Sequence, residues 1–352
     1  MSPFKTALYL LIASVLMTSC GDTSKKSNHG FSLSFKDDAK KIPVASSLGL
    51  IISNQKQQSV DSVVYFVDDI RWTSANLDPI TIDFKDGRVG QRQITAQIYS
   101  GATTYTTSKN IILLANQAPE VYEYTILETY PHDRTAFTQG IEFVGDTLYE
   151  STGKTGLSTL RKVDYTTGEV IQNVNLGPQF FGEGLTVKDG KVYQLTWKRN
   201  IGMVYNATTL EKERIFNYNK SLEGWGLCND GSTIYKSDGT QRIWTLDSNN
   251  LLESGYIEVY THTSKIDQIN ELEYIEGKIY ANVWQKDAIA IINPNTGVVE
   301  GIINTKTLKD QVTQHEDLDV LNGIAYKGEP GIIYLTGKNW DKLFKVQISL
   351  AQ

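Results

Sequence analysis

Short apolar runs, most of them alternating in polarity, follow one another along the chain. Between residues 30 and 117 they include FSLSF, LGLII, VVYFVDD, ITIDF and QRQITAQIYS, and Gly, Asn, Asp and Ser separate them. A period of two is typical of half-buried strands, and this part of the sequence has no convincing helical period. Short strands at this spacing predict a small β-sandwich of immunoglobulin-like type over residues 30–117.

The rest of the chain repeats one pattern. An apolar residue followed by Tyr recurs at intervals of 44, 42, 45 and 54 residues, at Tyr149, Tyr193, Tyr235, Tyr280 and Tyr334. Each pair follows a turn rich in Gly or Asp, and most are followed by a second apolar run, which gives roughly four short strands per repeat. This period is typical of a propeller blade, so five repeats predict a five-bladed β-propeller over residues 121–350.

The ends of this repeated region predict how the ring closes. The fifth repeat stops at LFKVQISL without a final strand, whereas VYEYTILETY, residues 121–130, is strand-like and belongs to no repeat. We expect this spare segment to complete the last blade. An open meander or a second sandwich would not explain the regular period.

Composition narrows the classes of protein. The chain has 352 residues, of which 40% are hydrophobic and 21% charged, as in folded globular proteins, and its length suits two domains. Its formal net charge is −6 and it has no block of Lys or Arg. This excludes a typical nucleic-acid-binding protein.

The N-terminus predicts export and a lipid anchor. Residues 1–20 combine a positive start, a short apolar core and the ending MTSC, which resembles a bacterial lipobox with Cys20 as the lipidated residue. Residues 21–29 are polar and predict a flexible tether. We therefore expect an exported bacterial lipoprotein of the cell envelope, on the periplasmic or surface face of the outer membrane. Cys228, the other cysteine, is expected to be a buried thiol.

Equivalent positions of the repeats converge at the mouth of a propeller channel. Where each inner strand begins, the position before the recurring Gly, or before Glu271 in the fourth repeat, is occupied by Gln139, Glu183, Trp225, Asn270 and Asn322. Four residues past each repeated Tyr stand Gly153, Trp197, Gly239, Trp284 and Lys338. An aromatic opening with a few convergent polar groups is typical of a small-molecule site.

Several strings then point to a known family. YPHDRTAFTQG, FGEGLT, QLTWK, EGWGL, NELEYIEGKIYANVW, LNGIAY and TGKNWDKLFKV resemble the glutamine cyclotransferases in order, over about residues 121–348. The resemblance implies a five-bladed propeller that converts the N-terminal glutamine of peptides or proteins to pyroglutamate and releases ammonia. By matching motif, it makes Glu183 the general acid/base. The pocket would be formed by Phe137, Gln139, Trp197, Trp225, Asn270, Trp284 and Lys338.

The family chemistry requires no cofactor, and a structural divalent cation stays open. Two other functions also remain open at this stage. A surface propeller without enzymatic activity would bind peptide ends or glycans in the aromatic mouth. A metal-dependent hydrolase of lactonase type would hold a divalent cation between Glu183, Asn270 and Asn322. A chelator distinguishes the lactonase from the cyclotransferase, because it abolishes only the activity of the metal-dependent lactonase. The sequence predicts neither the oligomeric state nor the task of the sandwich.

Overall fold

The computed structural model describes residues 29–352. The predicted signal segment 1–20, the lipidated Cys20 and most of the tether 21–29 therefore lie outside the described residues. Within 29–352 nearly all regular structure is β-strand, and the two helical pieces are short 3-10 turns, η1 (Lys36–Asp38) and η2 (Lys309–Gln311). The all-β prediction is confirmed. None of the helices in this range is long and apolar enough to cross a membrane.

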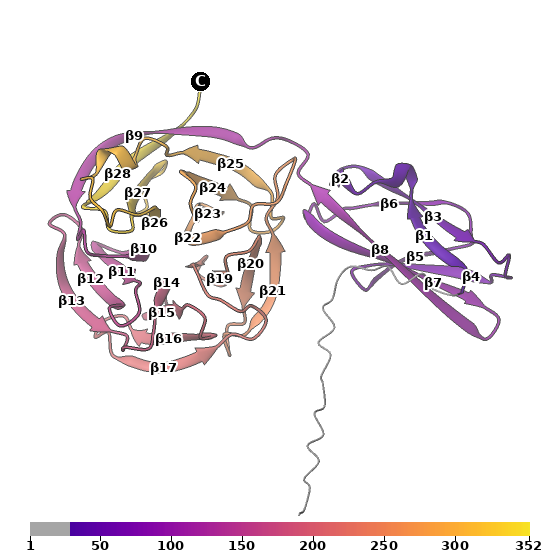
Figure 1. Cartoon of the computed structure of the whole chain (residues 1–352), viewed down its shortest axis with the longest axis horizontal. Coiled ribbons are helices and arrows are strands. Elements are labelled where there is room, and N and C mark those ends of the chain that lie inside the picture. The colour runs from indigo at the N-terminus through magenta and orange to yellow at the C-terminus, as the bar shows by residue number, and fades with distance from the viewer. Residues whose placement is uncertain (1–28) are drawn as a thin grey trace, which may run out of the picture.

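The N-terminal part consists of two sheets, on the right in Figure 1. The first has the order β1 (Phe31–Phe35), β3 (Ser47–Asn54), β6 (Ile80–Asp83). The second has the order β2 (Lys41–Pro43), β8 (Thr103–Leu114), β7 (Gly90–Ser100), β4 (Ser62–Val67), β5 (Ile70–Ala75). Alternate residues of both sheets are buried in one hydrophobic cluster that includes Leu50, Tyr65 and Ile94. This is the alternation that the sequence pattern displays.

The remaining strands form a ring (Figure 1). Three of its sheets have four antiparallel strands each, in chain order. The first comprises β10 (Thr138–Val144), β11 (Thr147–Thr152), β12 (Thr159–Asp164) and β13 (Glu169–Asn175). The second comprises β14 (Gly182–Lys188), β15 (Lys191–Thr196), β16 (Ile201–Asn206) and β17 (Lys212–Asn217). The third comprises β18 (Leu227–Asn229), β19 (Ile234–Ser237), β20 (Arg242–Leu246) and β21 (Glu253–Glu258).

Two further four-stranded groups are joined into one eight-stranded sheet. One group is β22 (Ile269–Ile275), β23 (Lys278–Val283), β24 (Ala288–Ile292) and β25 (Val299–Asn304). The other is β26 (Leu321–Ala325), β27 (Ile332–Gly337), β28 (Lys342–Leu350) and β9 (Glu120–Pro131). The repeated tyrosines lie on the second strand of each group, namely β11, β15, β19, β23 and β27. The repeat in the sequence is therefore a repeat of four-stranded units.

The prediction for residues 121–130 is confirmed. Strand β9 pairs antiparallel with β28 along its length, from Pro131 opposite Lys342 to Tyr122 opposite Leu350. Its first residues also pair in parallel with β25, where Glu120 lies opposite Gly301. The first strand of the ring thus completes its last four-stranded group, which ties the two ends of the ring together.

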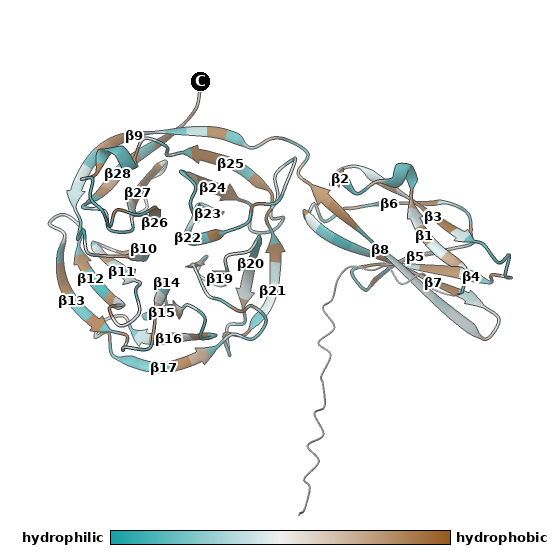
Figure 2. Cartoon of the chain, in the orientation of Figure 1, coloured by the Kyte–Doolittle hydropathy of each residue, from teal (hydrophilic) through white to brown (hydrophobic). Residues whose placement is uncertain are grey.

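The five inner strands meet around the axis of the ring, since β10 contacts both β14 and β26, and β18 and β22 complete the circle. Glycine permits this approach. A side-chain carbon on Gly226 would lie 2.1 Å from the carbonyl oxygen of Asn270, and one on Gly184 would lie 2.6 Å from Cα of Gly226. Apolar and polar residues are interspersed along the outer strands (Figure 2). Hydrophobic clusters fill the spaces between neighbouring sheets.

The two-sheet part contacts the ring directly. Tyr260, from the ring, is buried in the hydrophobic cluster of the N-terminal sheets. The Gln91 N–H donates to Glu258 Oε2 at 2.7 Å, and Nη2 of Arg88 donates to the carbonyl oxygen of Tyr256 at 2.8 Å. Both contacts involve the outer strand β21 and the loop before β7 or its first residues. The N-terminal sheets therefore dock on the rim of the ring, away from its axis.

Candidate active site

One cavity of about 380 Å³ collects most of the residues that the sequence singled out. Its lining consists of Phe137, Gln139, Phe181, Glu183, Trp197, Trp225, Asn270, Trp284, Asp319 and Lys338. Eight of the nine predicted site residues are among them. The register of the repeats, read from the sequence, therefore identified positions that share one opening.

Irregular strand starts orient the polar side chains of the cavity. Gln139, Glu183 and Asn270 are each the second residue of an inner strand, on β10, β14 and β22. The pairing with the next strand shifts register at each of these points, as it does at Asn322 on β26. A bulge leaves one residue out of the ladder and re-aims its side chain. Equivalent bulges thus place these residues at one level of the axis.

Asn322 is the predicted residue that does not line the cavity. It occupies the equivalent bulge, but its side chain is fully buried. Its Nδ2 donates to the carbonyl oxygen of Thr138 at 3.0 Å and to Oε1 of Gln139 at 3.4 Å. The Oδ1 of Asn322, like that of Asn270, has no hydrogen-bond partner among the described residues. Its amide is used for packing between β26 and β10, where it contacts the side chain of Gln139.

Aromatic rings wall the cavity in two groups. In the first, Phe137 meets Phe181 edge-on at 6.1 Å between ring centroids, and Phe181 lies 5.5 Å from Trp197. In the second, Trp225 meets Trp284 edge-on at 6.0 Å. Edge-to-face contacts favour fixed ring orientations. The aromatic walls are therefore preformed surfaces.

The two glycines of the predicted second ring make room for these walls. A side-chain carbon on Gly153 would lie 2.6 Å from the Phe181 ring, and one on Gly239 would lie 2.6 Å from the Trp225 ring. Gly239 also has a φ of +79°, in the region that favours glycine. Where the repeat carries Gly instead of Trp or Lys, an aromatic ring from a neighbouring loop occupies the space.

The titratable side chains that line the cavity are those of Glu183, Lys338 and Asp319. Burial raises the pKa of the Glu183 carboxyl well above its usual range; the ammonium of Lys338 opposes this rise, and the carboxylate of Glu223 adds to it. Burial likewise lowers the pKa of Lys338, against the pull of Glu183 and Asp319. The Lys338 nitrogen lies 5.0 Å from the centroid of the Phe137 ring. The two groups therefore share one cavity, where burial disfavours the charged form of each.

Asn270 provides an unused acceptor. Its side chain is buried, and its Oδ1 has no hydrogen-bond partner among the described residues. A buried acceptor without a partner costs about 1–3 kcal/mol, so such a group in a cavity is expected to meet a donor on a ligand. The cavity thus offers a carboxyl group, a cation and an open amide to a small polar ligand.

Sequence reasoning missed three residues. Phe181 stands next to the predicted motif in FFGEGLT, and Asp319 is the last residue of HEDLD, a run that resembles a solvated loop. Glu223 has the clearest contacts of the three, because its Oε2 accepts both the Trp197 and Trp225 indole N–H groups, at 2.7 and 2.8 Å. Its only sequence signal is its place two residues before Trp225.

Other chemically active side chains have structural surroundings. The two ring nitrogens of His132 lie 2.8 Å from the carbonyl oxygen of Trp340 and 3.1 Å from Glu150 Oε1. Cys228 is buried, and burial raises the pKa of its thiol, as expected for an unreactive cysteine. Across residues 29–352 no cluster of three or more His, Cys, Asp and Glu side chains has the arrangement of a metal site.

Comparison with known proteins agrees with this geometry. A family model described as glutamine cyclotransferase matches residues 93–348. A glutaminyl-peptide cyclotransferase of Arabidopsis thaliana is 37% identical over 234 residues, which cover 66% of this chain and 73% of the plant protein. The crystal structure of a glutaminyl cyclase of Myxococcus xanthus superposes with a TM-score of 0.61 and 34% identity, over 66% of this chain and all of that one.

Proposed function

Because the chain belongs to the glutamine cyclotransferase family, we propose that its cavity closes the N-terminal glutamine of a peptide or protein into pyroglutamate and releases ammonia. The observation that carries the proposal is the buried carboxyl of Glu183, raised in pKa and enclosed by aromatic walls. A volume of about 380 Å³ lies at the small end of ligand pockets, as expected for a site that takes one residue.

Glu183 is the proton carrier in this proposal. The α-amine attacks the γ-carboxamide carbon of the same residue, so a C–N bond forms and a five-membered lactam closes. The C–N bond to the amide nitrogen then breaks, and ammonia leaves. The attacking nitrogen loses one proton and the leaving nitrogen gains one, so a single carboxyl group that contacts both balances the reaction. Such general acid–base catalysis contributes about 10²–10⁴-fold.

The other groups of the cavity stabilise and orient the substrate. The Lys338 ammonium faces the negative charge that develops on the γ-carbonyl oxygen, and a dry site strengthens this interaction. The free Oδ1 of Asn270 accepts from the α-amine or the amide N–H of the substrate. Gln139 also lines the cavity, and the aromatic walls hold the folded glutamine side chain. Restricting its two ends uses proximity more than electrophilic activation.

The geometry favours this reaction over the lactonase reading. That alternative needs Glu183, Asn270 and Asn322 to converge on one cation, and Asn322 is not among the residues that line the cavity with Glu183 and Asn270. The cyclase scheme requires no cofactor, since Glu183 and Lys338 supply the proton transfer and the charge. A non-enzymatic role in binding peptide ends or glycans is the outcome if no turnover is found.

The experiment is ammonia release from a glutamine-initiated dipeptide by the protein without its first twenty residues, with and without chelator. Glu183→Gln keeps the volume of the side chain and removes its proton transfer, so we expect a loss of 10²-fold or more. Glu211→Gln, an exposed carboxylate on the rim, is the matched control and should stay at the parent rate. Near-parent turnover by Glu183→Gln would remove this residue from the mechanism.

We further propose that the chain is a two-domain lipoprotein. The lipobox-like MTSC predicts diacylation of Cys20, the segment 21–29 would be the tether, and 30–117 and 121–350 would be the sandwich and the catalytic domain. Two acyl chains suffice for stable anchoring in an envelope membrane. Fatty-acid labelling in a bacterial host should mark the parent and not Cys20→Ser. An unlabelled parent in the soluble fraction would refute the anchor.

A further inference from the structure

A single carboxylate oxygen joins the two aromatic walls of the cavity. Trp197 follows strand β15 and belongs to the wall with Phe181, whereas Trp225 precedes β18 and belongs to the wall with Trp284. Oε2 of Glu223 accepts the indole N–H of both, at 2.7 Å from Trp197 and 2.8 Å from Trp225. A hydrogen bond with a charged acceptor is roughly twice as strong as a neutral one.

A lysine adds a second contact on the outer side of this junction. The Lys198 nitrogen lies 3.7 Å from Oε1 of Glu223 and 4.0 Å from the centroid of a Trp197 ring. The Glu223 side chain is three-quarters buried. Both oxygens of Glu223 are therefore engaged, one by the two indoles and the other by an ammonium group, and the carboxylate has a fixed orientation.

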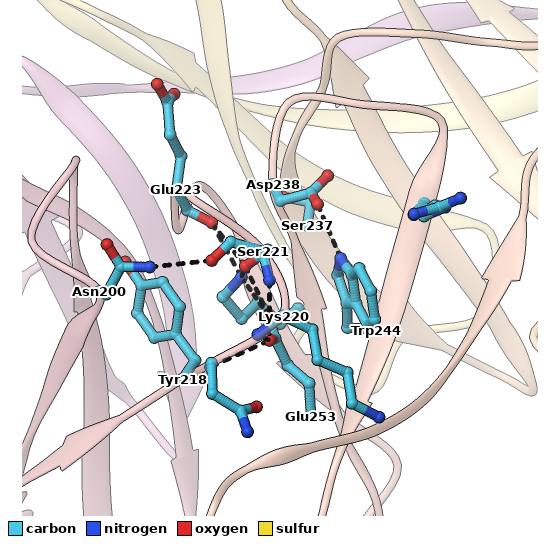
Figure 3. A network of polar contacts seen from close by, with 12 residues as sticks. Asn200, Tyr218, Lys220, Ser221, Glu223, Ser237, Asp238, Trp244 and Glu253 are labelled. Carbon is cyan, nitrogen blue, oxygen red and sulfur yellow. Dashed lines mark hydrogen bonds and ion pairs between the residues drawn. The ribbon is translucent and has the colours of Figure 1, made fainter. Parts of the chain in front are cut away.

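Two buried side chains, Glu253 and Lys236, anchor the loop that carries Glu223. Oε2 of Glu253 accepts the backbone N–H groups of Asn219, Lys220 and Ser221 at 3.2, 2.6 and 3.0 Å. Nζ of Lys236 donates to the carbonyl oxygen of Glu223 at 2.9 Å and lies 3.0 Å from Oε1 of Glu253. The side chains of this ion pair are fully buried. Figure 3 shows Lys220, Ser221, Glu223 and Glu253 within this network of polar contacts.

We infer that Glu223 is a positioning residue of the active site: its carboxylate sets the two tryptophans that it accepts from, Trp197 and Trp225, at the separation that the substrate side chain requires. This inference rests on the proposed cyclase function. Ring packing does not connect the two walls to each other, because no ring contact joins Trp197 with Trp225 among the described residues. A backbone or side-chain acceptor reached by only one indole would leave the other N–H unpaired in an apolar wall.

The charge of Glu223 has a second effect on the reaction. Its carboxylate raises the pKa of the Glu183 carboxyl, which burial already raises and Lys338 opposes. The Asp319 carboxylate, beside Lys338, raises the pKa of that ammonium group. Removing the Glu223 charge therefore lowers the pKa of Glu183. The limb of the pH–rate profile that reports this carboxyl moves to lower pH, whereas the limb that reports the substrate amine does not move.

The test compares Glu223→Ala, Glu223→Gln and a matched control, Asp238→Asn. Asp238 also accepts an indole N–H, from Trp244 at 2.7 Å, in a neighbouring loop outside the cavity (Figure 3). The readouts are the indole N–H signals of the tryptophans in ¹⁵N-labelled protein, their exchange with solvent, and kcat, KM and their pH dependence. Thermal melting checks that each variant is folded.

Glu223→Ala should expose the Trp197 and Trp225 indole N–H groups to exchange and lower kcat/KM by about tenfold to a hundredfold, as small misplacements in active sites do. Glu223→Gln can still accept both N–H groups, so it should keep most of the indole protection and show mainly the pH shift. Asp238→Asn should change the Trp244 signal and leave kcat/KM at the parent value.

Two outcomes would overturn the inference. One is unchanged exchange of both indoles in Glu223→Ala. The other is a loss of kcat/KM in Asp238→Asn as large as in Glu223→Ala. Such a loss would show that any change in the loops around the cavity lowers activity. A parent protein that releases no ammonia would refute the cyclase function instead, and the indole signals would still decide whether Glu223 fixes the two rings.

Discussion

Replacing Lys236 with Met isolates the buried ion pair under the Glu223 loop. Lys236 and Glu253 have fully buried side chains, with 3.0 Å between Nζ and Oε1. The Lys236 nitrogen also donates to Ser221 Oγ at 2.6 Å and lies 4.3 Å from the centroid of the Tyr218 ring. Met keeps the length of the aliphatic stem and removes the charge, so the change leaves a carboxylate without its cation.

The expected cost follows from what remains around Glu253. Breaking a buried pair by removing one partner costs about 3–5 kcal/mol. Glu253 keeps three backbone N–H donors and the Ser221 hydroxyl, which still solvate its charge. We therefore expect the lower end, about 3 kcal/mol, which is a large part of the 5–15 kcal/mol that typically stabilises a protein.

Urea unfolding followed by circular dichroism measures this cost, together with the double variant Lys236→Met/Glu253→Gln. Because the double variant removes both charges, it should recover at least half of the loss. The single variant should also raise KM, since the Glu223 loop loses its anchor. A single variant as stable as the parent, or a double variant less stable than the single one, would refute the view that the pair acts as a unit.

Three further changes test other parts of the structure. Gly226→Ala places a methyl group 2.1 Å from the Asn270 carbonyl oxygen and should lower the free energy of unfolding by about 3 kcal/mol. The control Gly255→Ala, whose nearest atom lies at 3.3 Å, should lower it by less than about 1 kcal/mol. Equal urea midpoints of the two variants would contradict the close approach at the axis. Asn270→Ala removes an unpaired buried acceptor, so it should raise KM about tenfold while the protein stays at least as stable as the parent; a large loss of stability would indicate a structural role. Burial would lower the pKa of His132, but the Glu150 carboxylate raises it above its usual value, and burial would raise the pKa of Glu150, but His132 and Arg161 lower it. The contribution of His132 to folding stability is fully present below a pH of about 6.5 and is lost as pH rises through the folded pKa of His132. The contribution of Glu150 is fully present above a pH of about 4.3 and is lost as pH falls through the folded pKa of Glu150. The stability difference between parent and His132→Gln should therefore be largest between these values, and a difference independent of pH from 4 to 9 would argue against the ion pair.

The ring and most of its catalytic opening could be predicted because both are written in a repeat. The period of the Tyr strands, the alternation along each strand and the missing last strand are local patterns, and β9 beside β28 is their direct consequence. Equivalent positions in a closed ring must converge at its axis. Glu183, Trp197 and Lys338 could therefore be assigned to one mouth from residue numbers alone.

What the tertiary structure decided lies in contacts between parts that do not share the repeat. Asn322 has the register of a cavity residue, yet its side chain turned to a neighbouring strand because a carbonyl oxygen was in reach there. Glu223 sits in a loop outside the repeated pattern, and only the packing of two sheets brings both indoles onto one oxygen. A sequence period specifies which strands face the axis, because strand geometry is local. It does not specify where a loop side chain ends, because that depends on the donors and acceptors that distant segments place around it.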